Sequence, residues 1–199
     1  MKNSIINYFT SLIYKKSIAY ILIIIYLILS YFHIKTTYNN SIRESSNFSL
    51  HIAATIENSL KIEDLKQLKA IESDINLLVY KDIKSKLIAL RKINHNAKFI
   101  YFLKQSENRI YFMADSEPEN SSDYSAPGDE YMNETDQEIY IPFRTGKTIL
   151  TKPTTDKWGT WISVLTPIKD PTTGKIIAVM GIDYAANEWF NSAKSAAIQ

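Results

Sequence analysis

The chain has 199 residues, 23 basic and 21 acidic side chains, a formal net charge of +2 and no cysteine. This length supports one domain with a packed core together with a non-globular segment. The small net charge excludes strong attraction to nucleic acid, and the absence of cysteine excludes disulfides, thiolate nucleophiles and cysteine zinc sites.

Residues 17–34 form an apolar run, SIAYILIIIYLILSYFHI, without Asp, Glu, Lys or Arg. As a helix these residues span roughly 27 Å, close to the thickness of a bilayer core. A cleaved signal peptide would need small residues after the run, and a buried helix would show a polar stripe; neither is present. We therefore predict a transmembrane helix at residues 17–34.

The basic residues flanking this run are distributed unevenly. Lys2, Lys15 and Lys16 precede it, whereas Lys35 and Arg43 follow it, the latter beside an acidic residue. The positive-inside rule therefore predicts that residues 1–16 are cytoplasmic and that the chain after the apolar run lies on the outer side of the membrane.

Three helical segments are predicted next. Residues 36–60 continue the first helix with a weak stripe at alternating spacing. The stripe consists of Tyr38, Ile42, Ser45, Ser49, Ile52, Ile56 and Ser59. A short helical turn is expected at residues 62–69. A further helix ending at Ile93 is expected to begin with Asp74 or Asn76 as its cap. Its expected apolar face is Leu77, Tyr80, Ile83, Leu87, Leu90 and Ile93.

From residue 97 onward the pattern indicates strands. Residues 98–104 and 109–114 are rich in aromatic and β-branched side chains, and the short polar segment between them predicts a hairpin. Residues 115–138 form an acidic loop without Lys or Arg, with a helical turn expected at residues 129–133. A loop of this length in a compact domain usually has a function, such as covering a site.

The remaining chain predicts a short strand at residues 147–152 and two longer strands at 160–169 and 175–184. Between the long strands, Asp-Pro-Thr-Thr-Gly predicts a turn, because proline presets φ and glycine adopts positive φ. A last helix is expected at residues 185–197.

The order of elements predicts an α+β fold. An N-terminal transmembrane helix and a long amphipathic helix precede an antiparallel sheet of about five strands, with helices on one sheet face. We expect the acidic loop to cover the other face and to leave a pocket between loop and sheet.

Two motifs in the second half carry a resemblance to a known family. One contains Asp-Ser-Glu-Pro at residues 115–118 and Pro127-Gly128; the other runs from Thr155 through the Trp-Gly-Thr-Trp block to Gly181-Ile182-Asp183. The sequence resembles the bacterial Cache (PAS-like extracytoplasmic) sensor domains of membrane-bound diguanylate cyclases, sensor histidine kinases and chemoreceptors. Ala126 stands where that family usually has a proline.

The resemblance implies a single Cache sensor module at residues 35–186, outside the membrane, that binds a small molecule such as an amino acid, an amine or an organic acid. It also implies a second membrane helix and an output domain after the sensor. The sequence contains neither before Gln199, so we expect a sensor portion of a longer protein or a shortened relative, with residues 187–199 leading toward the missing parts. We expect no enzyme activity in this chain, although a missing output domain could be a cyclase or a kinase.

Eight residues are candidates for ligand binding: Asp183, Trp158, Trp161, Tyr124, Tyr131, Tyr140, Arg144 and Asp115. Asp183 follows an apolar strand, where a carboxylate is costly unless it meets a cation or several donors. The resemblance implies that it holds a ligand amine; the alternative is that it caps the following helix. The tryptophans offer faces for a cation or a flat apolar group, or they belong to the core.

The other candidates are open to structural interpretations. The three tyrosines come from the acidic loop region and can close over the pocket, or each can be structural. Arg144 can bind a ligand carboxylate, although an ion pair with a loop acid is favoured. Asp115 is favoured as the acceptor of an Asx-turn. The acidic loop lacks the Asp-x-Asp-x-Asp-Gly calcium pattern, and His33, His51 and His95 lack metal-ligand spacing, so we expect no metal and no cofactor.

Two other functions remain as alternatives. The chain can be a dimerisation or interaction module without a ligand, with the stripe from Tyr38 to Ile56 as the seam of a homodimer. A remote alternative is a hydrolase that uses Asp183 with Asp115 or Glu117 as an acid–base pair.

Overall fold

The computed structural model describes residues 2–59, 61–132 and 137–198, which divide into two compact units. The first unit contains residues 1–43 and 192–199, and the second contains residues 44–191. Helix α1 (Lys2–Ser59) begins in the first unit. Among the described residues it is the one helix that is long and apolar enough to cross a membrane, and large apolar side chains of residues 18–34 are exposed along it. Exposure of this kind suits a helix surrounded by lipid.

Three helices precede the sheet in the second unit: α2 (Ile62–Gln67), the 3-10 helix η1 (Glu72–Asn76) and α3 (Leu78–Ile93). The prediction that Asp74 or Asn76 caps α3 is wrong. Leu77 occupies the N-cap position of α3 without a side-chain hydrogen bond. Asp74 instead accepts the backbone N–H groups of residues 69, 70 and 71 at 2.8, 2.8 and 3.3 Å. Its carboxylate therefore stabilises the turn before η1.

The buried face of α3 differs in part from the predicted one. Tyr80, Ile83 and Leu87 are buried as expected, but Lys84 is buried with them. Leu77 and Ile93, predicted to be apolar-face residues, are 38% and 78% exposed. The buried stripe therefore contains a charge that must find a partner.

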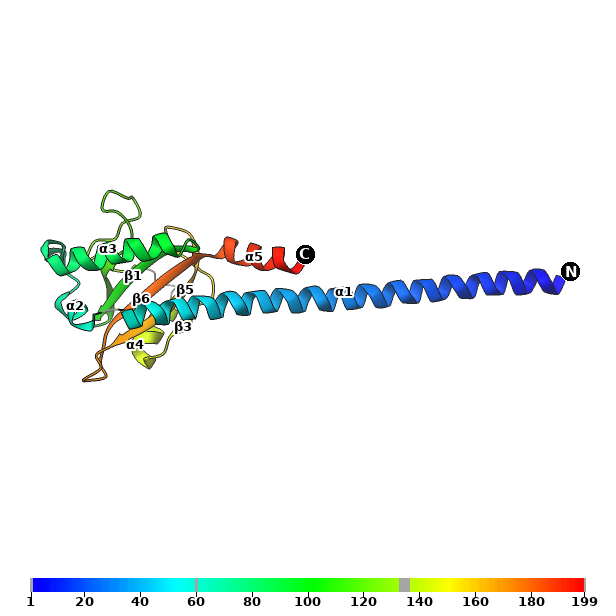
Figure 1. Ribbon diagram of the computed structural model, residues 1–199, viewed down its shortest axis with the longest axis horizontal. Helices are drawn as coiled ribbons and strands as arrows, with labels where there is room; N and C mark the ends of the chain where they lie inside the picture. The colour runs from blue at the N-terminus through cyan, green and yellow to red at the C-terminus, as the bar shows by residue number, and fades with distance from the viewer. Residues whose placement is uncertain (1, 60, 133–136, 199) are drawn as a thin grey trace. The chain divides into compact units, whose positions relative to one another are not determined.

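The second unit contains one antiparallel sheet in the order β2-β1-β6-β5-β3, with β4 paired to β5. Figure 1 labels β1, β6, β5 and β3 of this sheet. The strands are β1 (Ala97–Ser106), β2 (Arg109–Asp115), β3 (Ile149–Leu150), β4 (Thr154–Thr155), β5 (Thr160–Lys169) and β6 (Ile176–Ala185). The sheet has six strands rather than about five because the short pair Thr154–Thr155 adds an edge. Helix α3 packs against β1 and β2 on one face.

The two hairpins form where the sequence predicts them. β1 pairs with β2, and β5 pairs with β6. The turn between β5 and β6 is closed by Asp170, whose carbonyl accepts the N–H of Gly174 at 2.8 Å and whose carboxylate accepts the N–H of Thr172 at 2.9 Å. Gly174 has a φ of 70°, the left-handed conformation that glycine adopts at low cost.

The acidic loop ends in two short helices, η2 (Glu138–Tyr140) and α4 (Ile141–Thr145). The helical turn predicted at residues 129–133 is not found over its described residues, 129–132, because Glu130 forms an isolated β-bridge with Tyr111; residue 133 lies outside the described part of the chain. Helix α5 (Ala186–Ile198) follows β6 directly.

The sheet face opposite α3 carries an aromatic core. Phe99, Tyr101 and Phe112 point to this face and pack with Trp161 and Ile139. Because side chains alternate along a strand, the neighbours Ile100 and Phe102 face the other way and are completely buried. The aromatic face forms the floor of the cleft described next.

Candidate ligand-binding site

A narrow cleft lies between the aromatic sheet face and the loops that cover it; its cavity volume is about 20 Å³, within about 350 Å³ of space between atoms that includes open solvent. The sheet contributes Phe99, Tyr101, Phe112, Asp115 and Asp183. The loops contribute Asp123, Ser125, Tyr131, Asp156 and Trp158. The pocket predicted between loop and sheet is therefore present, and its walls combine aromatic rings with carboxylates.

Asp183 lies inside β6, where it is paired with Phe99 of β1 on one side and Ser163 of β5 on the other. Its side chain is buried, and its Oδ1 accepts a hydrogen bond from the Tyr101 hydroxyl at 3.0 Å. Gly181 makes this contact possible, because a Cβ at that position would overlap the Tyr101 ring. The ring thus lies across β6 and presents its hydroxyl to the carboxylate two residues further along.

Asp156 organises the tryptophan block at the other wall. Its Oδ1 accepts the backbone N–H groups of Trp158 and Gly159 at 2.8 and 3.0 Å and the indole N–H of Trp161 at 2.9 Å. Three donors on one oxygen fix the backbone of the turn and the Trp161 indole relative to each other. The Trp158 ring lines the cleft, whereas Trp161 packs against Phe99 with ring centroids 5.2 Å apart.

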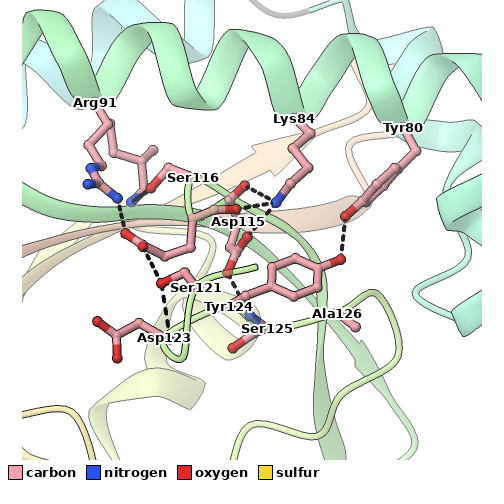
Figure 2. Close-up of polar contacts among 12 residues, drawn as sticks. Tyr80, Lys84, Arg91, Asp115, Ser116, Ser121, Asp123, Tyr124, Ser125 and Ala126 are labelled. Atoms are coloured by element: carbon pink, nitrogen blue, oxygen red, sulfur yellow. Dashed lines mark hydrogen bonds and ion pairs between the residues drawn. The ribbon is translucent and has the colours of Figure 1, made fainter. Parts of the chain in front are cut away.

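Asp115 ends β2 at the wall nearest α3 and is held on both oxygens. Oδ1 accepts from Lys84 Nζ at 2.9 Å, and Oδ2 accepts from the Ser125 backbone N–H at 2.7 Å (Figure 2). Burial raises the pKa of the Asp115 carboxyl, while the Ser125 N–H and the Lys84 ammonium act in the opposite direction. The loop beyond β2 is therefore tied to the helix through this carboxylate.

Further contacts join α3 to the same loop. Arg91 pairs with Glu117, and the other Glu117 oxygen accepts from Ser121 Oγ at 2.9 Å. The Tyr80 and Tyr124 hydroxyls are 2.9 Å apart, and Figure 2 shows Tyr80, Lys84 and Arg91 extending from one helix toward the loop. Burial, followed by the hydrogen bond to Tyr124, raises the pKa of Tyr80.

The structure brings four of the eight predicted residues together. Asp183, Asp115, Trp158 and Tyr131 line the cleft. Trp161 belongs to the core beneath it. Tyr124 lies behind the wall, with Lys84 Nζ 4.3 Å from its ring centroid.

Tyr140 and Arg144 are not among the cleft residues. The Arg144 guanidinium stacks 5.2 Å from the Tyr140 ring centroid, and the Arg144 side chain is exposed. Loop acids that form ion pairs in the described part of the chain do so with Lys84, Arg91 and Arg109.

The six other lining residues were not predicted from the sequence: Phe99, Tyr101, Phe112, Asp123, Ser125 and Asp156. The alternation in Lys98-Phe99-Ile100-Tyr101 indicates two faces, but only the pairing of β1 with β6 reveals which face meets Asp183. Asp156 precedes the tryptophan block directly, so its position in an Asx-type turn was a usable signal.

The chemistry of the cleft suits a positively charged group. Four of its described lining residues are aspartates, and none is Lys, Arg or His. Aromatic faces add cation–π attraction and apolar contact. No group of three or more potential metal-ligating side chains occurs among the residues that the structure describes.

The chain shares its fold, an antiparallel sheet with helices on one face and a loop-covered cleft on the other, with solved sensory domains of chemoreceptors and of DcuS. No family model and no curated protein matches the sequence. Among solved structures, the ligand-binding domain of the Campylobacter jejuni chemoreceptor Tlp3 in complex with L-norvaline has a TM-score of 0.54 at 16% identity. The E. coli DcuS sensor domain has a TM-score of 0.52 at 20% identity.

The two comparisons differ in extent. The match to Tlp3 covers 81% of this chain but only 59% of the Tlp3 chain. The match to DcuS covers 79% of this chain and 97% of that domain. Tlp3 is also matched in its complex with 4-methylisoleucine, at 19% identity and a TM-score of 0.52. The described chain thus spans about three-fifths of the Tlp3 domain and nearly all of the DcuS domain.

Proposed function

We propose that the chain is the ligand-binding sensor module of a membrane receptor and that its ligand carries an amino group. The observation that supports this most directly is the composition of the cleft: aspartates and aromatic rings line it, and its described walls contain no basic side chain. A carboxylate buried among aromatic rings is stabilised by hydrogen-bond donors and by a cation, because burial removes much of its hydration.

Asp183 is the residue that we propose contacts the ligand ammonium. It is buried in the sheet, lines the cleft and receives a neutral hydroxyl donor from Tyr101. Trp158 and Tyr131 would enclose the remainder of the ligand through their rings. Asp115 is engaged on both oxygens, so its role in this proposal is to hold the wall.

The ligand classes expected from the sequence are ranked by this geometry. Amines and amino acids both offer an ammonium group, whereas an organic acid without one would bring a negative charge toward several aspartates. The cleft therefore favours amines, and amino acids whose carboxylate can remain near the open mouth, over organic acids. Tlp3 has been crystallised with L-norvaline and 4-methylisoleucine, both of which carry an amino group.

The domain arrangement belongs to the same proposal. Residues 1–16 lie in the cytoplasm, residues 17–34 cross the inner membrane, residues 35–186 form the sensor outside it, and residues 187–199 lead toward a second membrane helix and an output domain. Because α5 follows β6 directly, a ligand on Asp183 would act on the strand that continues into this helix. A ligand shifts such an equilibrium only by its difference in affinity for the two states.

A homodimer through α1 is the second arrangement expected from the sequence. Ser49 and Ile56 of the predicted seam are already buried within the single chain, as is Ala53 beside them. The seam of a dimer would therefore have to use the residues of the α1 stripe that precede Ser49. The hydrolase alternative requires an acid–base pair of Asp183 with Asp115 or Glu117, whereas Asp115 is bound by Lys84 and Ser125, and Glu117 is bound by Arg91 and Ser121.

A thermal-shift screen on the full chain in detergent tests the proposal. Amines and amino acids should raise the unfolding temperature, and organic acids of similar size should not. The Asp183→Asn variant should lose the response to amines while keeping its own folded baseline. Stabilisation by organic acids alone, or by none of the three classes, would overturn the proposal.

A further inference from the structure

We propose that Lys84 sets the charge selectivity of the cleft: it neutralises Asp115 from the side of α3 and so reduces the advantage of a ligand with two positive charges over a ligand with one. This inference rests on the amine-binding function proposed above and assigns to Lys84 the control of the preference between one and two ammonium groups. Lys84 is a positioning residue in this account, because it does not line the cleft and acts through Asp115.

The position of Lys84 supports this role. It extends from the buried face of α3, and the side chains of Lys84 and Asp115 are only 8% and 6% exposed. Its Nζ donates to Asp115 Oδ1 at 2.9 Å and to the Glu117 carbonyl at 2.5 Å. Figure 2 shows the lysine reaching the carboxylate from the helix side. The ammonium thus approaches the Asp115 carboxylate from α3.

Lys84, rather than Arg91, is the cation that pairs with Asp115. Arg91, the nearby guanidinium on α3, is paired with Glu117. Tyr80 and Tyr124 donate or accept as neutral hydroxyls, and the Tyr124 ring lies against the lysine at 4.3 Å. The remaining carboxylates that line the cleft are Asp123, Asp156 and Asp183. Lys84 is therefore the cation bound directly to Asp115.

The consequence for ligands follows from the charge balance. With Lys84 in place, Asp115 contributes a wall without net charge, so it adds little attraction for a second ammonium group on the ligand. Without the lysine charge, the same wall would present a carboxylate that can attract a second ammonium group in addition to the other cleft aspartates. Selectivity of this kind is a difference between two affinities, and one buried charge changes it strongly.

The test compares butylamine with 1,4-diaminobutane, which share one carbon chain and differ in one ammonium group. Affinities are measured on the full chain in detergent at neutral pH for the wild type, Lys84→Met and Lys84→Met/Asp115→Asn. Lys84→Met should raise the diamine-to-monoamine affinity ratio by about tenfold or more. The double variant, which has lost both charges, should return to the wild-type ratio.

An unchanged ratio in folded Lys84→Met overturns the inference. If that variant does not fold, Asp115→Asn takes its place: it leaves the lysine charge uncompensated, so it should weaken the diamine more than the monoamine, and equal weakening overturns the inference.

Failure of the amine function itself is recognised separately, because neither amine would then bind the wild type. In that case, an NMR titration of the Asp115 carboxyl carbon tests, without any ligand, whether Lys84 neutralises Asp115. Lys84→Met should shift the titration of Asp115 to higher pH, and an unshifted titration overturns the role given to Lys84.

Discussion

The hydroxyl of Tyr101 donates a hydrogen bond to Oδ1 of Asp183 at 3.0 Å, from β1 to the adjacent strand β6. The bond joins the aromatic floor of the cleft to the carboxylate that we propose as the ammonium contact. It depends on the absence of a side chain at position 181, over which the tyrosine ring lies.

Gly181→Ala is expected to displace the Tyr101 ring, because the new Cβ would occupy the same space. Overpacking of this kind costs about 1–3 kcal/mol, and the cleft floor would be disordered as well. Chemical denaturation measures the loss of stability. Tyr101→Phe is the matched control, since it removes the hydroxyl alone and should cost about 1 kcal/mol. Combining Gly181→Ala with Tyr101→Ala should relieve the overlap; an additive loss in the double variant would contradict this explanation.

Asp156→Ala is expected to release the tryptophan block. One oxygen of Asp156 accepts three N–H groups, including the indole of Trp161, and these donors would lose their acceptor together. We expect a loss of about 1–3 kcal/mol in the free energy of unfolding and a red shift in tryptophan emission. Asp156→Asn retains a side-chain oxygen and should show a smaller change in both. Unaltered emission in Asp156→Ala would show that the turn holds the rings without this carboxylate.

Lys84→Met is expected to destabilise the second unit by about 3–5 kcal/mol at neutral pH, because it leaves the Asp115 carboxylate buried without its cation. The loss should shrink as the pH falls. Burial already raises the pKa of Asp115 in the folded chain, so folding is favoured when this carboxyl is protonated and is progressively penalised as the pH rises through the raised pKa.

Removal of Lys84 withdraws an interaction that lowers the pKa of Asp115, so the penalty in the variant extends over a wider range of pH. Unfolding experiments between pH 4 and 8 measure this loss of stability in Lys84→Met. Lys84→Met/Asp115→Asn is the control, and its stability should not show this dependence. A loss in Lys84→Met that stays constant across that range would contradict the pairing.

The orientation of the chain can be tested because the sequence contains no cysteine. A single cysteine at the exposed position Thr173 should react with a membrane-impermeant maleimide in cells whose outer membrane is permeable. A cysteine at Asn3 should react only after the inner membrane is opened. The opposite labelling pattern would place residues 35–186 in the cytoplasm and remove the basis for an external sensor.

Patterns within neighbouring residues predicted most of the fold. The strand at residues 160–169 has the predicted bounds, and the return strand begins one residue later than predicted, because alternation and the Asp-Pro-Thr-Thr-Gly turn are local signals. The additional strand β4 was missed because two residues, Thr154 and Thr155, contain no periodicity.

The composition of the cleft was harder to predict, because it depends on strand order. β1 lies between β2 and β6, so Phe99 meets Asp183 across 84 positions of sequence, and no local pattern records that pairing. Lys84 was missed for another reason. Because lysines are rarely buried, a lysine four residues after Tyr80 was interpreted as an interruption of the apolar stripe rather than as a part of it.

Calorimetric titration of the full chain with butylamine, compared between the wild type and Asp183→Asn, tests the central claim most directly. The two side chains are nearly equal in size and differ in charge, so the account predicts saturable binding to the wild type and at least about tenfold weaker binding to the variant. Equal affinities in two folded proteins would show that Asp183 does not contact the ammonium group.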